Sequence, residues 1–194
     1  TVSTGIGGGI IVDGRMLLGQ EGYAAEIGHM QMAIDGRATT LEKEAAGPAL
    51  ARKARARLEA GEPSIMRELA DGDPSHVSGK VLSKAARQGD ALALSIVHEA
   101  AHILGLGVVT LLHIFNPEII VFGGGVSFGL GELLFEPMRE TVREHVIDSA
   151  YHERLRYEMA ALGENVSIVG AGALVATHGG VDDVRKVIAR LDSE

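Results

Sequence analysis

Two glycine clusters are the parts of this sequence best suited to bind phosphate groups. In Thr4-Gly5-Ile6-Gly7-Gly8-Gly9, the missing side chains allow backbone N–H groups to approach a phosphate, and the Thr4 hydroxyl can add a donor. Gly123-Gly124-Gly125-Val126-Ser127 follows the apolar run Ile119 to Phe122 and precedes a predicted helix, which is where open α/β sheets bind ligands. Glycine runs also form tight turns or allow close packing, so each cluster taken singly leaves a structural role equally open.

A second group of residues has the chemistry of a sugar site. Glu26 and His29 are three residues apart in Glu26-Ile27-Gly28-His29, and Glu42 follows further along the chain. A carboxylate and an imidazole on a loop that enters a strand can together hydrogen-bond vicinal hydroxyl groups. The alternative is that Glu26 is a solvated charge and His29 a partly buried histidine with its hydrogen bonds satisfied.

A third pattern suggests metal chemistry. His98-Glu99-Ala100-Ala101-His102 matches the HExxH motif, in which two histidines one helical turn apart bind zinc and the glutamate activates water. The predicted helix continues into a very apolar segment, and the nearest candidate for a third ligand, Glu118, is on the following strand. We therefore expect His98 and His102 to be partly exposed helix residues, with a zinc hydrolase as a remote alternative.

The elements that must position these residues alternate between strands and helices, which predicts an α/β fold. Asp13-Gly14 favours a two-residue hairpin turn, and Asn116-Pro117 should end the longest helix. The predicted strands are Ile6 to Val12, Arg15 to Leu18, about His29 to Ile34, and Glu118 to Phe122. The predicted helices are Gly47 to Ala60, Ser78 to Gln88, Ala91 to Phe115, one beginning near Pro137, and Val181 to Leu191, with a closing strand and helix through Val166 to Ala176.

Composition limits the class of protein. The 194 residues are 46% hydrophobic, which is enough to bury the core of one domain. A formal net charge of −8 argues against a nucleic-acid-binding surface, which needs clustered Lys and Arg. The absence of cysteine excludes disulfides and thiolate metal ligands, and no signal-peptide pattern opens the chain, so we expect a cytoplasmic protein. The longest apolar stretch, Ile103 to Phe115, is shorter than the roughly 20 residues of a membrane span and should be a core helix.

The order of the motifs resembles the ROK family of sugar kinases and transcriptional repressors. The resemblance covers nearly all of residues 1 to 176, in the segments TGIGGGIIVDG, GYAAEIGHM, LE followed by AAGPAL, LGLGVVTLLHIFNPEIIVFGGGVS and VGAGALVA. It implies the two-lobed actin/hexokinase-like (ribonuclease H-like) ATPase fold, with residues 1–194 as the carboxy-terminal nucleotide- and sugar-binding lobe.

The resemblance also assigns roles to individual residues. It implies an ATP site with nucleotide-bound Mg²⁺, in which Thr4, Gly5 and Gly7 belong to the phosphate loop and Gly123, Gly124 and Gly125 lie by the nucleoside. It further implies that Glu26, His29 and Glu42 bind the hydroxyl groups of a hexose such as glucose or an N-acetylhexosamine.

Two departures from the family pattern matter. Most members carry a three-cysteine cluster between the EIGH and LE motifs that binds a structural zinc together with the motif histidine. Here Ile34-Asp35-Gly36-Arg37 runs almost directly into Ala38-Thr39-Thr40-Leu41-Glu42, which leaves only His29 of the four ligands, so we expect the zinc to be absent. The family's catalytic aspartate lies in the amino-terminal lobe, which we expect to precede Thr1, so we predict that the chain alone is inactive.

The resemblance leaves two functions open, an ATP-dependent hexose kinase and a sugar-sensing transcriptional repressor. The residues that distinguish them would lie upstream: a helix-turn-helix segment for the repressor, or a phosphate loop and aspartate for the kinase. The resemblance also implies a homodimer, for which the apolar faces of Ala91 to Phe115 and Pro137 to Val146 could supply the interface.

Overall fold

A 25-residue helix, α5 (Ala91–Phe115), is the central element of the larger of two structural units. The Asp90 side chain caps its start by accepting a hydrogen bond from the Ala93 N–H (2.8 Å), and Asn116 ends it in the left-handed conformation at φ 43°. By length and composition α5 could span a membrane, but 67% of its most apolar window is buried inside the chain. It is therefore the core helix that the sequence predicted.

The computed structural model describes residues 1–191. Unit 1 comprises Thr1–Ile6 and Ile27–Met159, and unit 2 comprises Gly7–Glu26 together with the described part of Ala160–Glu194. In unit 1, the bounds of the elements beside α5 are η1 (Ile27–His29), β3 (Gln31–Ile34), β4 (Arg37–Thr40), α1 (Leu41–Ala45), α2 (Gly47–Glu59), α3 (Met66–Leu69), η2 (Pro74–His76), α4 (Gly79–Arg87), β5 (Ile119–Phe122), α6 (Gly125–Leu130), α7 (Glu132–His145), α8 (Ala150–Glu153) and β6 (Arg156–Met159).

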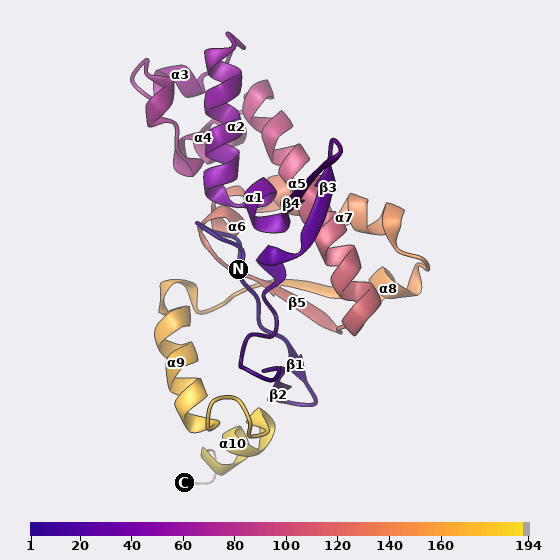
Figure 1. Cartoon of the computed structure of the whole chain (residues 1–194). Helices are drawn as coiled ribbons and strands as arrows, with labels where there is room; N and C mark the ends of the chain where they lie inside the picture. The colour runs from indigo at the N-terminus through magenta and orange to yellow at the C-terminus, as the bar shows by residue number, and fades with distance from the viewer. Residues whose placement is uncertain (192–194) are drawn as a thin grey trace. The chain divides into compact units, whose positions relative to one another are not determined.

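Helix α7 packs along α5, and α2 and α4 pack on α5 and on each other (Figure 1). Close approach of α5 and α7 depends on Gly105, because a Cβ at this position would lie 2.7 Å from the Thr141 Cβ. The apolar faces of α5 and α7 are thus used inside unit 1, with Leu134, Met138 and Val142 of α7 buried in the same core cluster. The sequence suggested apolar faces of these two helices for a dimer interface; the residues named here pack inside unit 1, and the dimer stays a prediction.

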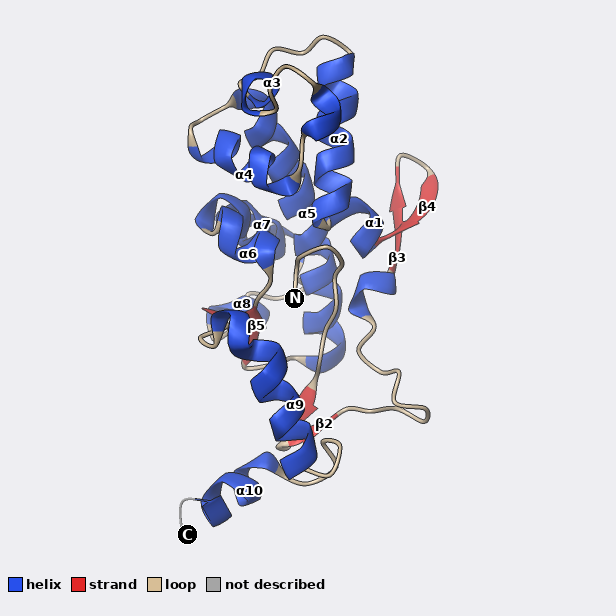
Figure 2. Ribbon diagram, turned by 90° about the vertical axis from the view of Figure 1, so that its left-hand side faces the viewer, coloured by secondary structure: helices blue, strands red, loops and turns tan. Residues whose placement is uncertain are grey.

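In the part of the chain that the structure describes, the strands form two-stranded pairs and no larger sheet. In unit 1, β3 and β4 form an antiparallel hairpin that leads into α1 (Figure 2). Strand β5 pairs with β6 in parallel. In unit 2, β1 (Ile11–Val12) and β2 (Arg15–Met16) form the hairpin predicted at Asp13-Gly14, and both turn residues have positive φ. The remaining elements of unit 2 are η3 (Gly163–Asn165), α9 (Val166–Ala176) and α10 (Val184–Leu191).

Several predicted boundaries were wrong. Helix α7 begins at Glu132, directly after Gly131 at φ 54°, so Pro137 lies inside the helix and not at its start. Val166–Ala176 is helical throughout, with no strand at its beginning. The strands of the first hairpin are only two residues each, and the segment after His29 is a strand only over Gln31–Ile34. Strands β4 and β6 were not predicted, because their alternation is short and weak in hydrophobic residues.

Candidate functional site

The segment of unit 1 that contains the predicted phosphate turn, residues 2–6, is surrounded by glycines from three other parts of the chain. An alanine Cβ at Gly28 would lie 2.0 Å from the Ile6 carbonyl oxygen, one at Gly47 would lie 3.0 Å from the Ser3 oxygen, and one at Gly124 would lie 2.5 Å from the Val2 oxygen. The Val2 and Ile6 side chains are buried at the two ends of the segment. The backbone between them, which includes Thr4 and Gly5, is therefore held in place by close backbone packing.

Glu42 is brought to this segment by helix α1. The Thr40 hydroxyl caps α1 by accepting from the Lys43 N–H (3.3 Å), and Glu42 follows in the first turn. The Glu42 Oε2 atom accepts a hydrogen bond from the Ile6 N–H at 2.9 Å. A Cβ at Gly5 would lie only 2.6 Å from the same oxygen, so glycine is needed there for the carboxylate to reach the turn. A predicted sugar residue and the predicted phosphate turn are thus in direct contact.

The second glycine cluster is joined to the same segment. The Val2 N–H donates to the Gly123 oxygen (2.8 Å), and the Val2 oxygen accepts from the N–H of Val126 in the first turn of α6 (3.1 Å). Gly124 has φ 97°, which an L side chain rarely adopts, while a Cβ on Gly125 would meet only the Ser3 Oγ at 3.7 Å. Gly124 therefore has the packing role that the sequence left open, and Gly125 is the exposed member of the turn.

The remaining predicted site residues are His29, Glu26 and Gly7. His29 ends η1, a short helix that packs against α1, and its side chain is exposed. Glu26 and Gly7 belong to unit 2, where both are exposed. The contact between Glu42 and Ile6 joins residues 36 positions apart, so motif spacing alone gave no sign of it. The nucleotide and sugar roles of all the predicted site residues, Glu26, His29 and Gly7 included, stay predictions.

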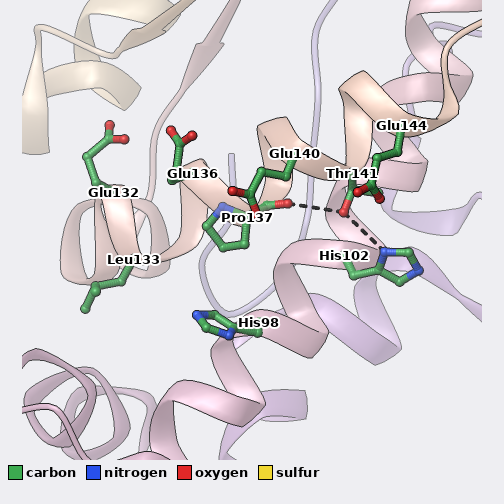
Figure 3. Close-up of a pocket in the computed structure, with 9 residues that line it drawn as sticks. All are labelled: His98, His102, Glu132, Leu133, Glu136, Pro137, Glu140, Thr141 and Glu144. Carbon is green, nitrogen blue, oxygen red and sulfur yellow. Dashed lines mark hydrogen bonds between the residues drawn. The ribbon is translucent and has the colours of Figure 1, made fainter.

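The HExxH residues form no metal site in the structure. His98 and His102 are exposed on α5 and line a pocket with residues of α7, among them Glu136, Pro137 and Glu140 (Figure 3). The Glu99 carboxylate is instead paired with Lys53 at 2.6 Å, and the His102 Nδ1 atom lies 3.2 Å from the Thr141 Oγ1. Among the residues described, no group of three or more His, Asp or Glu side chains is arranged to bind a metal ion. This pocket contains none of the predicted nucleotide or sugar residues.

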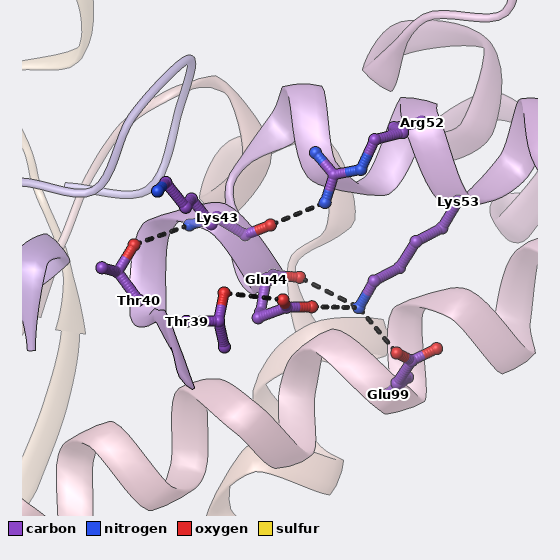
Figure 4. Close-up of polar contacts among 7 residues, drawn as sticks. All are labelled: Thr39, Thr40, Lys43, Glu44, Arg52, Lys53 and Glu99. Carbon is purple, nitrogen blue, oxygen red and sulfur yellow. Dashed lines mark hydrogen bonds and ion pairs between the residues drawn. The ribbon is translucent and has the colours of Figure 1, made fainter. Parts of the chain in front are cut away.

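Glu44, on the same helix as Glu42, was missed by the sequence analysis. Its side chain is buried and accepts a hydrogen bond from the Thr39 hydroxyl at 2.8 Å, and Lys53 lies 3.3 Å away (Figure 4). Burial alone would raise the pKa of Glu44, but the Thr39 hydrogen bond and the Lys53 ammonium outweigh it and hold the pKa below its usual value of 4.5. The only signal in the sequence was a charge between the apolar residues Leu41 and Ala45.

The lowered pKa of Glu44 predicts a pH-dependent stability. A carboxyl group with a lower pKa in the folded state stabilises the protein above its unfolded pKa, and this contribution is lost as the pH falls through the folded pKa. We expect the urea midpoint of the chain to exceed that of Glu44→Gln at pH 7, and the difference to shrink steadily from pH 5 to pH 3. A difference that stays constant over this range would show that ionised Glu44 contributes no stability.

These features define a class of protein. The chain covers a little over half of solved ROK sugar kinases, which defines it as an α/β lobe of the actin/hexokinase-like fold. The sequence profile of the ROK family matches residues 1–178. The chain therefore belongs to the ROK family.

Individual relatives support this membership. The glucokinase of Thermotoga maritima is 38% identical over 183 residues, which are 90% of this chain and 56% of that protein. A ROK family glucokinase from Streptomyces griseus, solved in complex with glucose and AMPPNP, has a TM-score of 0.78 and 35% identity over 89% of this chain and 58% of its own. A ROK family transcriptional regulator described as a homologue of the E. coli MLC protein has a TM-score of 0.70 and 30% identity over 81% of this chain and 40% of its own. The chain spans a little over half the length of the two glucokinases.

Proposed function

We propose that this chain is the hexose- and nucleotide-binding part of an ATP-dependent sugar kinase. The observation that carries the proposal is the hydrogen bond between the Glu42 carboxylate and the Ile6 N–H at the end of the Thr4-Gly5 turn. Transfer of a phosphoryl group requires the acceptor hydroxyl and the terminal phosphate to be held side by side, because positioning supplies much of the catalysis. A residue that contacts the phosphate turn while carrying a hydroxyl-binding carboxylate fits this requirement.

The two oxygens of Glu42 then have different tasks. Oε2 accepts from the Ile6 N–H, and Oε1 is proposed to accept from a hexose hydroxyl, with His29 and Glu26 as further hexose ligands. Thr4, Gly5 and Gly7 would face the phosphates of ATP, which brings its own Mg²⁺, and Gly123 and Gly125 would face the nucleoside. We assign no general base in this chain and propose that it binds its ligands without phosphoryl transfer. The glucose and AMPPNP bound to the S. griseus glucokinase support the ligand classes.

Titration calorimetry of the 194-residue chain tests the sugar assignment. We expect glucose or an N-acetylhexosamine to bind, and Glu42→Ala to weaken binding by roughly 10- to 100-fold, because a hydrogen bond to a charged group is worth about 1.5–3 kcal/mol. Glu59→Ala is the matched control, because it removes an exposed carboxylate on α2 and should leave the affinity unchanged. Equal affinities of the Glu42→Ala variant and the unaltered chain would remove Glu42 from the sugar site.

A sugar-sensing repressor is the second candidate, favoured by the similarity to the ROK transcriptional regulator. The higher identity to the T. maritima glucokinase favours the kinase. Binding of AMPPNP with Mg²⁺ separates the two, since a sensor needs only the sugar. Hexose binding without any nucleotide binding would support the repressor. A homodimer, which the family resemblance implies, and a cytoplasmic location, which was expected from composition, remain parts of the proposal.

A further inference from the structure

Glu44 is the one acidic or basic side chain that is buried among the residues the structure describes, with 5% of its surface exposed. Its two partners come from two neighbouring elements. Thr39 on β4 donates to its carboxylate, and Lys53 on α2 contacts both its carboxylate (3.3 Å) and its backbone oxygen (3.2 Å). The Lys53 Nζ atom also forms an ion pair with the Glu99 Oε1 atom on α5, at 2.6 Å (Figure 4). We call Thr39, Glu44 and Lys53 the Glu44 cluster.

The cluster acts on a short helix whose apolar residues Leu41 and Ala45 are buried in the core. Helix α1 has five residues, which is too short for a helix to be stable without contacts to the rest of the fold. Successive residues of an α-helix are about 100° apart, so Glu42 and Glu44 point to roughly opposite sides of α1. The side that carries Glu44 is fixed to β4 and α2, and the side that carries Glu42 reaches the Ile6 N–H.

We propose that Glu44 is a positioning residue, which through Thr39 and Lys53 sets the rotation of α1 and so holds the Glu42 carboxylate on the phosphate turn. The geometric part of this inference stands on the contacts of unit 1 alone. Its consequence for hexose binding rests on the proposed function. The side-chain contacts of Glu44 are with Thr39 and Lys53 and not with the turn. Glu44 would therefore act only through the placement of Glu42.

Amide hydrogen exchange in the 194-residue chain tests the geometric part directly. We expect Glu44→Gln to speed exchange of the Ile6 N–H by about tenfold or more, as Glu42→Ala should, because both loosen a hydrogen bond to a carboxylate. The amides of Val108 and Leu112 in α5 serve as the internal reference for global opening. Glu99→Gln is the matched control, because it removes the other carboxylate paired with Lys53 but leaves Thr39 and Glu44 in place.

The outcomes separate positioning from general stability. Acceleration at Ile6 that clearly exceeds the acceleration at Val108 and Leu112, which report the loss of global stability expected of Glu44→Gln, would support the proposal. Equal acceleration at all three sites, or no change at Ile6, would overturn it. A second pair of variants guards against a general loss of structure: Lys53→Met should speed exchange at Ile6, and Lys53→Arg should restore it to within about threefold of the original rate, because the cation is retained.

Hexose titration of the same variants tests the consequence. Glu44→Gln should weaken hexose affinity by a factor comparable to its effect on Ile6 exchange, while Glu99→Gln should not. An unchanged hexose affinity in Glu44→Gln, despite faster exchange at Ile6, would overturn the functional half of the proposal. If the unaltered chain binds no hexose, the proposed function fails while the exchange result still decides whether Glu44 positions Glu42.

Discussion

Replacing Gly28 by alanine is expected to reduce the free energy of unfolding of unit 1 by roughly 3 kcal/mol, because the new Cβ overlaps a backbone that cannot move away. The Cβ would lie 2.0 Å from the Ile6 oxygen and 3.0 Å from the Ile6 carbonyl carbon. Ile6 is anchored by its buried side chain and by the hydrogen bond from its N–H to Glu42. Urea denaturation followed by circular dichroism would measure the change.

Gly79→Ala is the control for this prediction. Gly79 is the first residue of α4 in the same unit, and the closest atom to its Cβ would be the Gly47 oxygen at 3.9 Å, an ordinary contact. Alanine there should be neutral or stabilise unit 1 by up to about 1 kcal/mol, because it restricts the unfolded chain. A Gly28→Ala variant as stable as Gly79→Ala would mean that residues 2–6 are not held against η1.

The second large effect is expected at the Gly123–Gly125 turn, where neighbouring glycines should respond in opposite ways. Gly124→Ala should cost roughly 2–3 kcal/mol of stability, because it combines a left-handed backbone with a Cβ 2.5 Å from the Val2 oxygen. Gly125→Ala should change stability by less than about 0.5 kcal/mol, since its surroundings are open. Urea midpoints of the two variants measured side by side would test this difference.

Ligand binding should reverse the order of the two variants. Gly125 is exposed, and a methyl group there would stand where the nucleoside is proposed to lie, so we expect AMPPNP affinity to fall by about tenfold in Gly125→Ala. Unchanged affinity in that variant, with its stability intact, would place the nucleoside elsewhere.

The sequence predicted the turns and helix ends that depend on one or two neighbouring residues. Asp13-Gly14 gave the first hairpin, Ser78 gave the start of α4, and Asn116 ended α5, because turns and caps depend on the chemistry of one or two residues. Strand β6 was missed because its pairing with β5 is created by residues about 37 positions away. The start of α7 was misplaced because Pro137 was taken as a first-turn residue, whereas Gly131 ends the preceding helix.

The same distinction between local signals and long-range contacts applies to the candidate site. The glycine clusters and the two glutamates were found from their types and order, and the family they indicated is the one to which the chain belongs. Their contacts were not predicted. The reach of Glu42 to Ile6 and the packing of Gly124 on Val2 join segments 36 and 122 residues apart, and no local pattern records such distances. Glu44 was missed for a related reason, since only the fold reveals that it is buried.

The packing of residues 2–6 between Gly28, Gly47 and Gly124 has a consequence for folding order. Each contact closes a long loop of chain, and loop closure costs entropy that must be repaid before the contact helps. We expect the segment to dock after η1, α2 and the β5–α6 turn have come together around it, so that substitutions within residues 2–6 act mainly on the rate of unfolding. On the proposed function, competence to bind nucleotide would then arise only once the rest of the unit has folded.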